Sequence, residues 1–104
     1  MNFGLSIETT DRIKGVFQKY PEVESVIIYG SRAKGNFREG SDIDLTLKGK
    51  SIPTQSISDI SSALDDLNTP YLFDISIFDR LNSPDLAEHI SRIGKVFYAK
   101  AEKA

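Results

Sequence analysis

The spacing of apolar residues predicts three amphipathic helices along the chain. The first covers about residues 6–20 and ends before Pro21, which cannot continue a helix. The second covers about residues 57–67, and the third begins at the pair Ser83-Pro84 and ends at Gly94, residue types that favour a helix start and a helix end. The apolar positions are Ile13, Val16, Phe17 and Tyr20, then Ile57, Ile60, Leu64 and Leu67, then Leu86, Ile90 and Ile93.

Strands are predicted between these helices. Residues 23–29 form a short run rich in β-branched side chains that ends at Gly30, which is typical of a buried strand. Residues 71–78 are a further apolar run after Pro70, and residues 96–99 are compatible with a last short strand. The segment 30–40 contains three glycines and is too irregular for more than one helical turn.

Residues 42–48 show strict alternation of apolar and polar side chains. The two sets are Ile43, Leu45 and Leu47 on one side and Asp42, Asp44 and Thr46 on the other. Alternate residues of a strand share a face, so this pattern predicts a half-buried strand with two carboxylates on its open face. The resulting order of elements is α-β-β-α-β-α with a terminal strand, which indicates one α/β domain over residues 1–104 with a frayed tail from Lys100.

Composition narrows the kinds of site and partner. The 104 residues include 13 basic and 15 acidic side chains, a net charge of −2, so autonomous binding of nucleic acid through bulk positive charge is not expected. The absence of cysteine excludes disulfides and thiolate metal sites, and His89 is the single imidazole. A metal ion would therefore be a hard cation held by oxygen. Neither a signal peptide nor a membrane-spanning run is present, which favours a cytoplasmic location.

Three aspartates and one glycine turn are the candidate metal- and phosphate-binding groups. Asp42 and Asp44 lie on one predicted strand and Asp74 on another, and three neighbouring carboxylates suit Mg²⁺ but repel one another without a cation. The turn Gly30-Ser31 offers close backbone approach, a hydroxyl and free N–H groups, which favour a phosphate. Phosphate donors facing metal-binding carboxylates are what phosphoryl or nucleotidyl transfer requires.

Ordinary structural explanations compete with these assignments. Asp74 could be a surface aspartate, and Asp79 lies close enough in sequence to take its place. Arg32 adds positive charge directly after Ser31, although basic residues in this segment could equally form a solvated loop face. His89 and Tyr29 are expected to be structural, Tyr29 as part of the core.

The residues Gly30-Ser31, followed after a spacer of ten by Asp42-Ile43-Asp44, resemble the signature of the DNA polymerase β-type nucleotidyltransferase superfamily. The similarity is greatest to its minimal (MNT) branch, whose members accompany HEPN-domain proteins. This resemblance implies a small mixed β-sheet packed with helices. It also implies that Gly30, Ser31 and Arg32 hold the nucleotide phosphates, and that Asp42, Asp44 and Asp74 ligate Mg²⁺ as the catalytic carboxylates.

The resemblance further implies an Mg²⁺-dependent enzyme that transfers AMP from ATP to a hydroxyl. About twenty-five residues follow the last catalytic strand, so the acceptor is expected on another chain, namely a tyrosine of a HEPN toxin in a hetero-oligomer, with this chain as the antitoxin. Two alternatives remain open. The chain could neutralise its partner by masking it without catalysis, or it could modify a small hydroxylated substrate alone.

Overall fold

A computed structural model of the chain describes residues 3–38 and 40–100 and contains the helices and strands in the predicted order. Their bounds, in chain order, are α1 Ile7–Gln18, β1 Ser25–Tyr29, α2 Ser31–Lys34, β2 Ile43–Lys48, α3 Thr54–Asp65, β3 Phe73–Ile77, the 3-10 turn η1 Phe78–Arg80, α4 Pro84–Ile93 and β4 Lys95–Ala99.

The expected elements are confirmed with small shifts at their ends. The single helical turn expected in segment 30–40 is α2, and the last short strand is β4. The third strand was expected to continue through Phe78, but it ends at Ile77 because Phe78 already belongs to the 3-10 turn. Asp42 was expected on the second strand, and it lies one residue before β2 begins.

The sheet is small and mixed, as expected. Its strand order is β3-β2-β1-β4, with β1 antiparallel to both β2 and β4 and with β2 parallel to β3. A parallel pair needs a long crossover, and α3 supplies it between β2 and β3. The two strands that carry the candidate carboxylates are therefore neighbours.

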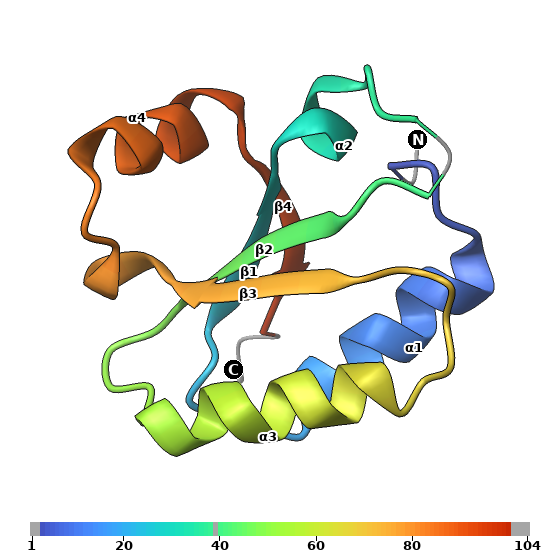
Figure 1. Ribbon diagram of the computed structural model, residues 1–104. Helices are drawn as coiled ribbons and strands as arrows, with labels where there is room; N and C mark the ends of the chain where they lie inside the picture. Colours follow the sequence, from blue (N-terminus) through green and yellow to red (C-terminus); the bar gives the residue numbers. More distant parts are fainter. Residues whose placement is uncertain (1–2, 39, 101–104) are drawn as a thin grey trace.

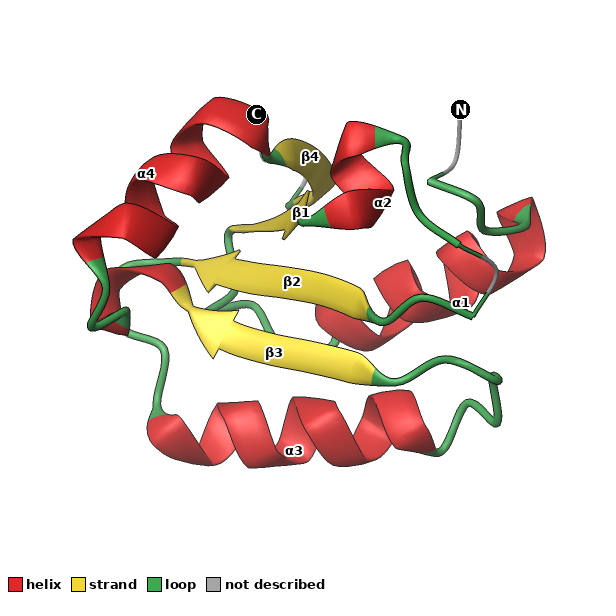
Figure 2. Ribbon diagram, turned by 45° about the horizontal axis from the view of Figure 1, so that its top comes forward, coloured by secondary structure: helices red, strands yellow, loops and turns green. Residues whose placement is uncertain are grey.

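Helices α1 and α3 cover one face of the sheet, and α2 and α4 lie over the opposite face (Figures 1 and 2). The apolar positions of β1 and β2 that face α1 and α3 are fully buried in the main core. The central members of this core are Ile13, Phe17, Val26, Ile28, Ile43, Leu45, Leu47, Ile60 and Leu64. The candidate carboxylates have the opposite parity on their strands, so they lie on the face shared with α2 and α4.

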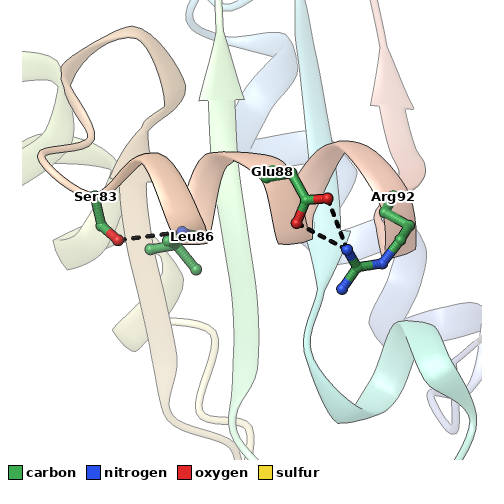
Figure 3. A network of polar contacts seen from close by, with 4 residues as sticks. All are labelled: Ser83, Leu86, Glu88 and Arg92. Carbon is green, nitrogen blue, oxygen red and sulfur yellow. Dashed lines mark hydrogen bonds and ion pairs between the residues drawn. The ribbon is translucent and has the colours of Figure 1, made fainter.

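The ends of α4 agree with the sequence prediction, one of them for an unexpected reason. The Ser83 hydroxyl accepts a hydrogen bond from the Leu86 N–H at 3.1 Å, as an N-cap does (Figure 3). Gly94 does end the helix, but its φ is −63°, a backbone angle that any residue can adopt. Glycine is required because a β-carbon there would lie 2.5 Å from Ile27 Cγ2 and 2.5 Å from the Ile90 carbonyl oxygen.

The end of β4 is tied to the loop that precedes β1. Lys100, expected to belong to a frayed tail, donates its N–H to the Glu24 carbonyl at 2.8 Å and its ammonium to the Pro21 carbonyl at 3.1 Å. The rest of that expected tail, residues 101–104, lies outside the described residues. Within residues 3–38 and 40–100, no helix is both long enough and apolar enough to cross a membrane.

Candidate active site

Gly30 joins β1 to α2 in a conformation that requires glycine. Its φ of +76° and ψ of −154° lie in a region that residues with a side chain rarely enter. A β-carbon at this position would also collide with the Asp44 Oδ2 atom. The Asp44 carboxylate therefore lies directly against the backbone of the turn, so the two halves of the predicted signature are in contact.

Ser31 begins α2, a helix of one turn that packs beside the end of β1. The Lys34 N–H donates to the Gly30 carbonyl at 3.1 Å, and the Gly35 N–H donates to the Ser31 carbonyl at 2.9 Å. The amides of residues 31–33 precede the first of these bonds, so the turn itself does not use them. One turn carries only a small dipole, so a phosphate here would depend on these amides and the Ser31 hydroxyl.

Asp44 and Asp74 are direct neighbours across the parallel pair of β2 and β3. The register places Asp44 beside Asp74 and Thr46 beside Ser76, on the same face of the sheet. Adjacent strands are about 4.8 Å apart, so the two carboxylates leave the sheet side by side. Asp79, the alternative third carboxylate, lies in η1 beyond the end of β3 and is exposed. The tertiary structure therefore groups Asp74 with Asp44.

Asp42 stands slightly apart from this pair. Its side chain is exposed on the loop just before β2. In the described part of the chain, no three acidic or histidine side chains converge closely enough to hold a metal ion by themselves. The arrangement is one close pair with a third carboxylate at its edge.

The pKa of Asp44 is raised above its ordinary value of 3.8. Partial burial is the largest cause, followed by the negative charges of Asp74 and then Asp42. Both neighbouring charges act on Asp44, which places all three carboxylates within one electrostatic site. A group whose charged form is disfavoured in this way is common where a cation binds.

Tyr29, expected to be part of the core, also belongs to the site face. It is buried, as expected for a core residue, but it pairs with Asp44 in the antiparallel register and points to the same face. Burial is the main cause that raises the pKa of its hydroxyl; a hydrogen bond with Ser76 lowers it, and the charges of Asp74 and Asp44 raise it further. The alternation along β1 indicates this placement, because Val26 and Ile28 face the main core and Tyr29 has the opposite direction.

Hydroxyl groups continue this polar face along the two parallel strands. The Ser76 hydroxyl donates to Thr46 Oγ1 at 2.9 Å, and Thr46 is fully buried. Together with Tyr29 they form a polar floor next to the Asp44–Asp74 pair. Such hydrogen bonds orient groups that would otherwise rotate freely.

Arg32 differs from its expected position. Only 2% of the residue is exposed, and its guanidinium donates to the main-chain carbonyls of Phe3 and Ser41. These donors are committed to the protein, so Arg32 does not present an open cationic group beside Ser31. His89, expected to be structural, is half-buried on α4.

The donor set of this site fits Mg²⁺. Every candidate ligand is a carboxylate oxygen, which suits a hard cation, and neither thiolate nor imidazole competes at the Asp44–Asp74 pair. Mg²⁺ is commonly held by one or two protein carboxylates together with phosphate oxygens, and two adjacent carboxylates are what the structure provides. The nearby Gly30-Ser31 turn is suited to those phosphates.

One family model matches most of this chain. The family model described as "Polymerase beta, Nucleotidyltransferase" matches residues 11–103. None of the curated proteins matches this sequence.

Several solved structures share the fold. A chain of a toxin–antitoxin complex with AMP-PNP aligns with a TM-score of 0.71 and 16% identity, covering 88% of this chain and 73% of that one. A chain of the MntA-HepT toxin–antitoxin aligns with a TM-score of 0.67 and 13% identity over 91% and 74%. A chain of the complex between a tri-AMPylated Shewanella oneidensis HEPN toxin and its MNT antitoxin aligns with a TM-score of 0.65 and 14% identity, covering 89% of this chain and 71% of that one.

Proposed function

This chain belongs to the polymerase beta nucleotidyltransferase family, and we propose that it transfers AMP from ATP to a tyrosine hydroxyl of a HEPN-domain partner, acting as the antitoxin. The observation that carries the proposal is the contact between the two halves of the site. The Gly30 backbone lies against the Asp44 carboxylate, and Asp74 stands next to Asp44. A phosphate held at the turn would therefore lie beside the Asp44 carboxylate, the neighbour of Asp74.

Each residue then has a distinct part in the transfer. The Gly30-Ser31 turn holds the triphosphate through amide groups and the Ser31 hydroxyl. Asp44 and Asp74, with Asp42 and the phosphate oxygens, would hold Mg²⁺, which when bound would neutralise phosphate charge and make the attacking hydroxyl more acidic. The acceptor oxygen bonds to the α-phosphorus as the bond from that phosphorus to the bridging β-oxygen breaks. Pyrophosphate leaves, and Asp74, exposed at the site, receives the hydroxyl proton.

The choice of donor and partner draws on proteins of the same fold. One of them forms a complex containing AMP-PNP, and another is an MNT antitoxin bound to an AMPylated HEPN toxin. These likenesses support ATP as the donor and a HEPN protein as the acceptor for this chain. They also support a hetero-oligomer, with the acceptor hydroxyl supplied by the partner.

Labelled ATP tests the reaction directly. The chain, purified in complex with a HEPN-domain partner, is incubated with Mg²⁺ and ATP labelled on either the α- or the γ-phosphate. We expect the partner to acquire the α-label and not the γ-label, and mass spectrometry to find the mass of AMP on a tyrosine. Transfer of the γ-label would instead indicate phosphoryl transfer and would contradict the proposal.

Two variants of equal charge change provide the control. Asp44→Asn removes a proposed ligand, whereas Asp79→Asn removes an exposed carboxylate from η1 outside the site. Loss of labelling in the first and normal labelling in the second are expected, with both variants still bound to the partner. If Asp44→Asn abolishes labelling yet still neutralises the toxin, masking of the partner is the function and the catalytic proposal for neutralisation fails.

A further inference from the structure

The guanidinium of Arg32 is held in one orientation by main-chain oxygens. Its Nε and Nη2 atoms donate to the Ser41 carbonyl at 3.1 and 2.9 Å, and Nη1 donates to the Phe3 carbonyl at 2.8 Å. A buried cation loses much of its hydration, and charge-assisted bonds to carbonyls offset part of that cost. Burial of this cation is thus only partly compensated, so we expect the arrangement to serve a function.

Two aromatic rings complete the surroundings of the cation. The guanidinium carbon lies 4.9 Å from the centre of the Phe37 ring and 4.8 Å from the centre of the Tyr71 ring. These are cation–π distances, and a planar guanidinium suits stacking far better than an ammonium does. Arginine is therefore the one basic residue that fits all of these contacts.

The N-terminal segment closes over the same group. Gly4 has a φ of +80°, and a β-carbon there would collide with the Phe37 ring and lie 2.9 Å from Arg32 Nη1. The backbone at Gly4 thus packs directly on the aromatic ring and the guanidinium. This cover explains why a charged side chain next to a candidate active site is almost fully buried.

Two of the contacts of Arg32, those with Ser41 and Tyr71, lie on segments that lead into site residues. Arg32 itself follows Ser31, its carbonyl partner Ser41 precedes Asp42, and Tyr71 lies at the start of the segment that continues into Asp74. One side chain thus connects the phosphate turn, the loop before β2 and the entry to β3. The Ile43 N–H donates to the Leu72 carbonyl at 2.9 Å and so already links the start of β2 to the entry of β3, whereas α2 lies outside the sheet.

We infer that Arg32 is a positioning residue, which holds the Ser31 turn, Asp42 and the entry to β3 in their mutual places, and not a ligand of the nucleotide phosphates. This inference rests on the proposed function. It predicts that loss of the guanidinium misplaces catalytic groups and lowers kcat. Removal of a direct phosphate ligand would chiefly raise the KM for ATP.

The test measures AMP transfer in the complete complex with its partner. Arg32→Lys keeps the positive charge but cannot make the paired bonds and the stacking; we expect kcat to fall about 10- to 100-fold with little change in the KM for ATP. Arg80→Lys is the matched control, since Arg80 is an exposed arginine of η1 outside the site. It should behave as the unmodified chain.

The aromatic partner gives a second, milder probe that stands even if Arg32→Lys does not fold. Tyr71→Leu removes the ring and should lower kcat, whereas Tyr71→Phe keeps the ring and should restore normal transfer. In the double variant Arg32→Lys/Tyr71→Leu the loss of kcat should be smaller than the product of the two single losses, because both changes disrupt the same set of contacts around the guanidinium. Multiplicative losses, or a rise in KM with kcat unchanged, would overturn the inference.

Hydrogen exchange separates this inference from the proposed reaction. In Arg32→Lys the backbone amides of residues 41–44 should exchange faster than in Arg80→Lys, whether or not any nucleotide is transferred. If the unmodified complex transfers no AMP, the proposed function fails while this measurement still decides the role of Arg32. Unchanged exchange at residues 41–44 would refute that role.

Discussion

At the scale of single residues, the site contains unfavourable interactions, and favourable contacts elsewhere in the fold have to offset their free energy. Gly30 adopts a conformation with a positive φ, and Asp44 occupies the space where a side chain at position 30 would lie. Asp44 itself is a partly buried carboxylate with two negative neighbours. Sites that bind a charged ligand commonly contain such conflicts, and each can be probed by one substitution.

Gly30→Ala should destabilise the chain by about 1–3 kcal/mol, because the added methyl group forces a strained backbone and collides with the Asp44 carboxylate. Gly15→Ala is the matched control: Gly15 lies within α1, and a β-carbon there meets no atom within 4 Å. That change should stabilise the chain by about 0.5–1 kcal/mol. Urea unfolding followed by circular dichroism measures both, and equal effects of the two substitutions would contradict the explanation.

Asp44→Asn should raise the melting temperature at neutral pH by on the order of 2–4 °C, since it removes a charge that burial and Asp74 disfavour. The folded pKa is raised, so the folded chain retains a proton that the unfolded chain has already lost. Stability of the unmodified chain therefore falls as the pH rises from about 3.8 through the folded pKa.

Thermal melts across pH 3 to 8 test this sign. Well below pH 3.8 the Asp44 side chain is protonated and neutral, like the asparagine that replaces it, so the unmodified chain and Asp44→Asn should have similar melting temperatures. As the pH rises, the melting temperature of Asp44→Asn should increasingly exceed that of the unmodified chain. Asp11→Asn, which changes an exposed carboxylate of α1, should show no comparable gain, and a difference that grows toward low pH would contradict the assignment.

At the scale of elements, the helices are specified by their own ends and the sheet by contacts between distant segments. The N-caps Ser6 and Ser83 each accept a bond from an amide three residues later. The exposed Glu88–Arg92 pair on α4, at 2.7 Å, adds little because water screens it (Figure 3). Local hydrogen bonds thus explain why the starts of α1 and α4 were predictable, whereas α3 has no side-chain cap and begins at Thr54, before the first apolar position of its stripe.

Ser83→Ala should cost about 1 kcal/mol of stability, because the Leu86 amide loses its acceptor at the start of α4. Ser91→Ala changes the same residue type at an exposed position within α4 and should be neutral or slightly stabilising. Chemical denaturation of the two variants measures the difference. A loss at Ser91 as large as that at Ser83 would show that the cap is not the cause.

At the scale of the whole molecule, a chain of this size has little stability to spare. The main core lies on one side of the sheet, and the site lies on the other. Changes in the core should therefore chiefly threaten folding, while changes at the site should alter activity or cation binding in addition to any effect on stability.

Leu45→Ala should destabilise the fold by about 2–5 kcal/mol, because Leu45 is completely buried in the central strand β2 and its loss leaves a cavity. Leu72→Ala removes the same side chain where it is 70% exposed and should change stability by less than about 0.5 kcal/mol. Urea titrations measure both values. A small effect at Leu45 would mean that the core is not packed as described.

Mg²⁺ should raise the melting temperature of the unmodified chain in the presence of ATP, and chelation with EDTA should reverse the gain. A ligand at ten times its dissociation constant stabilises the folded state by about 1.4 kcal/mol. The double variant Asp42→Asn/Asp44→Asn should lose most of this response, whereas Asp79→Asn should keep it. An equal response in both variants would place the cation elsewhere.

The sequence by itself determined the features that depend on neighbouring residues. Apolar spacing, caps and proline placed the helices, alternation placed the strand bearing Asp44, and the Gly30-Ser31 turn and its distance from Asp42 identified the family. These features are local, because hydrogen bonding and side-chain direction within an element depend on residues a few positions away.

Only the tertiary structure decided the features that depend on distant segments. The place of Asp74 directly beside Asp44, with Asp79 beyond the end of the strand, follows from the register of two parallel strands joined through α3. The burial of Arg32 and the place of Tyr29 on the site face follow from packing and pairing between segments far apart in the chain. Strand register and packing sum many weak contacts at long range; the alternation within β1 indicates which face Tyr29 takes, but no local pattern shows which distant side chains it meets there.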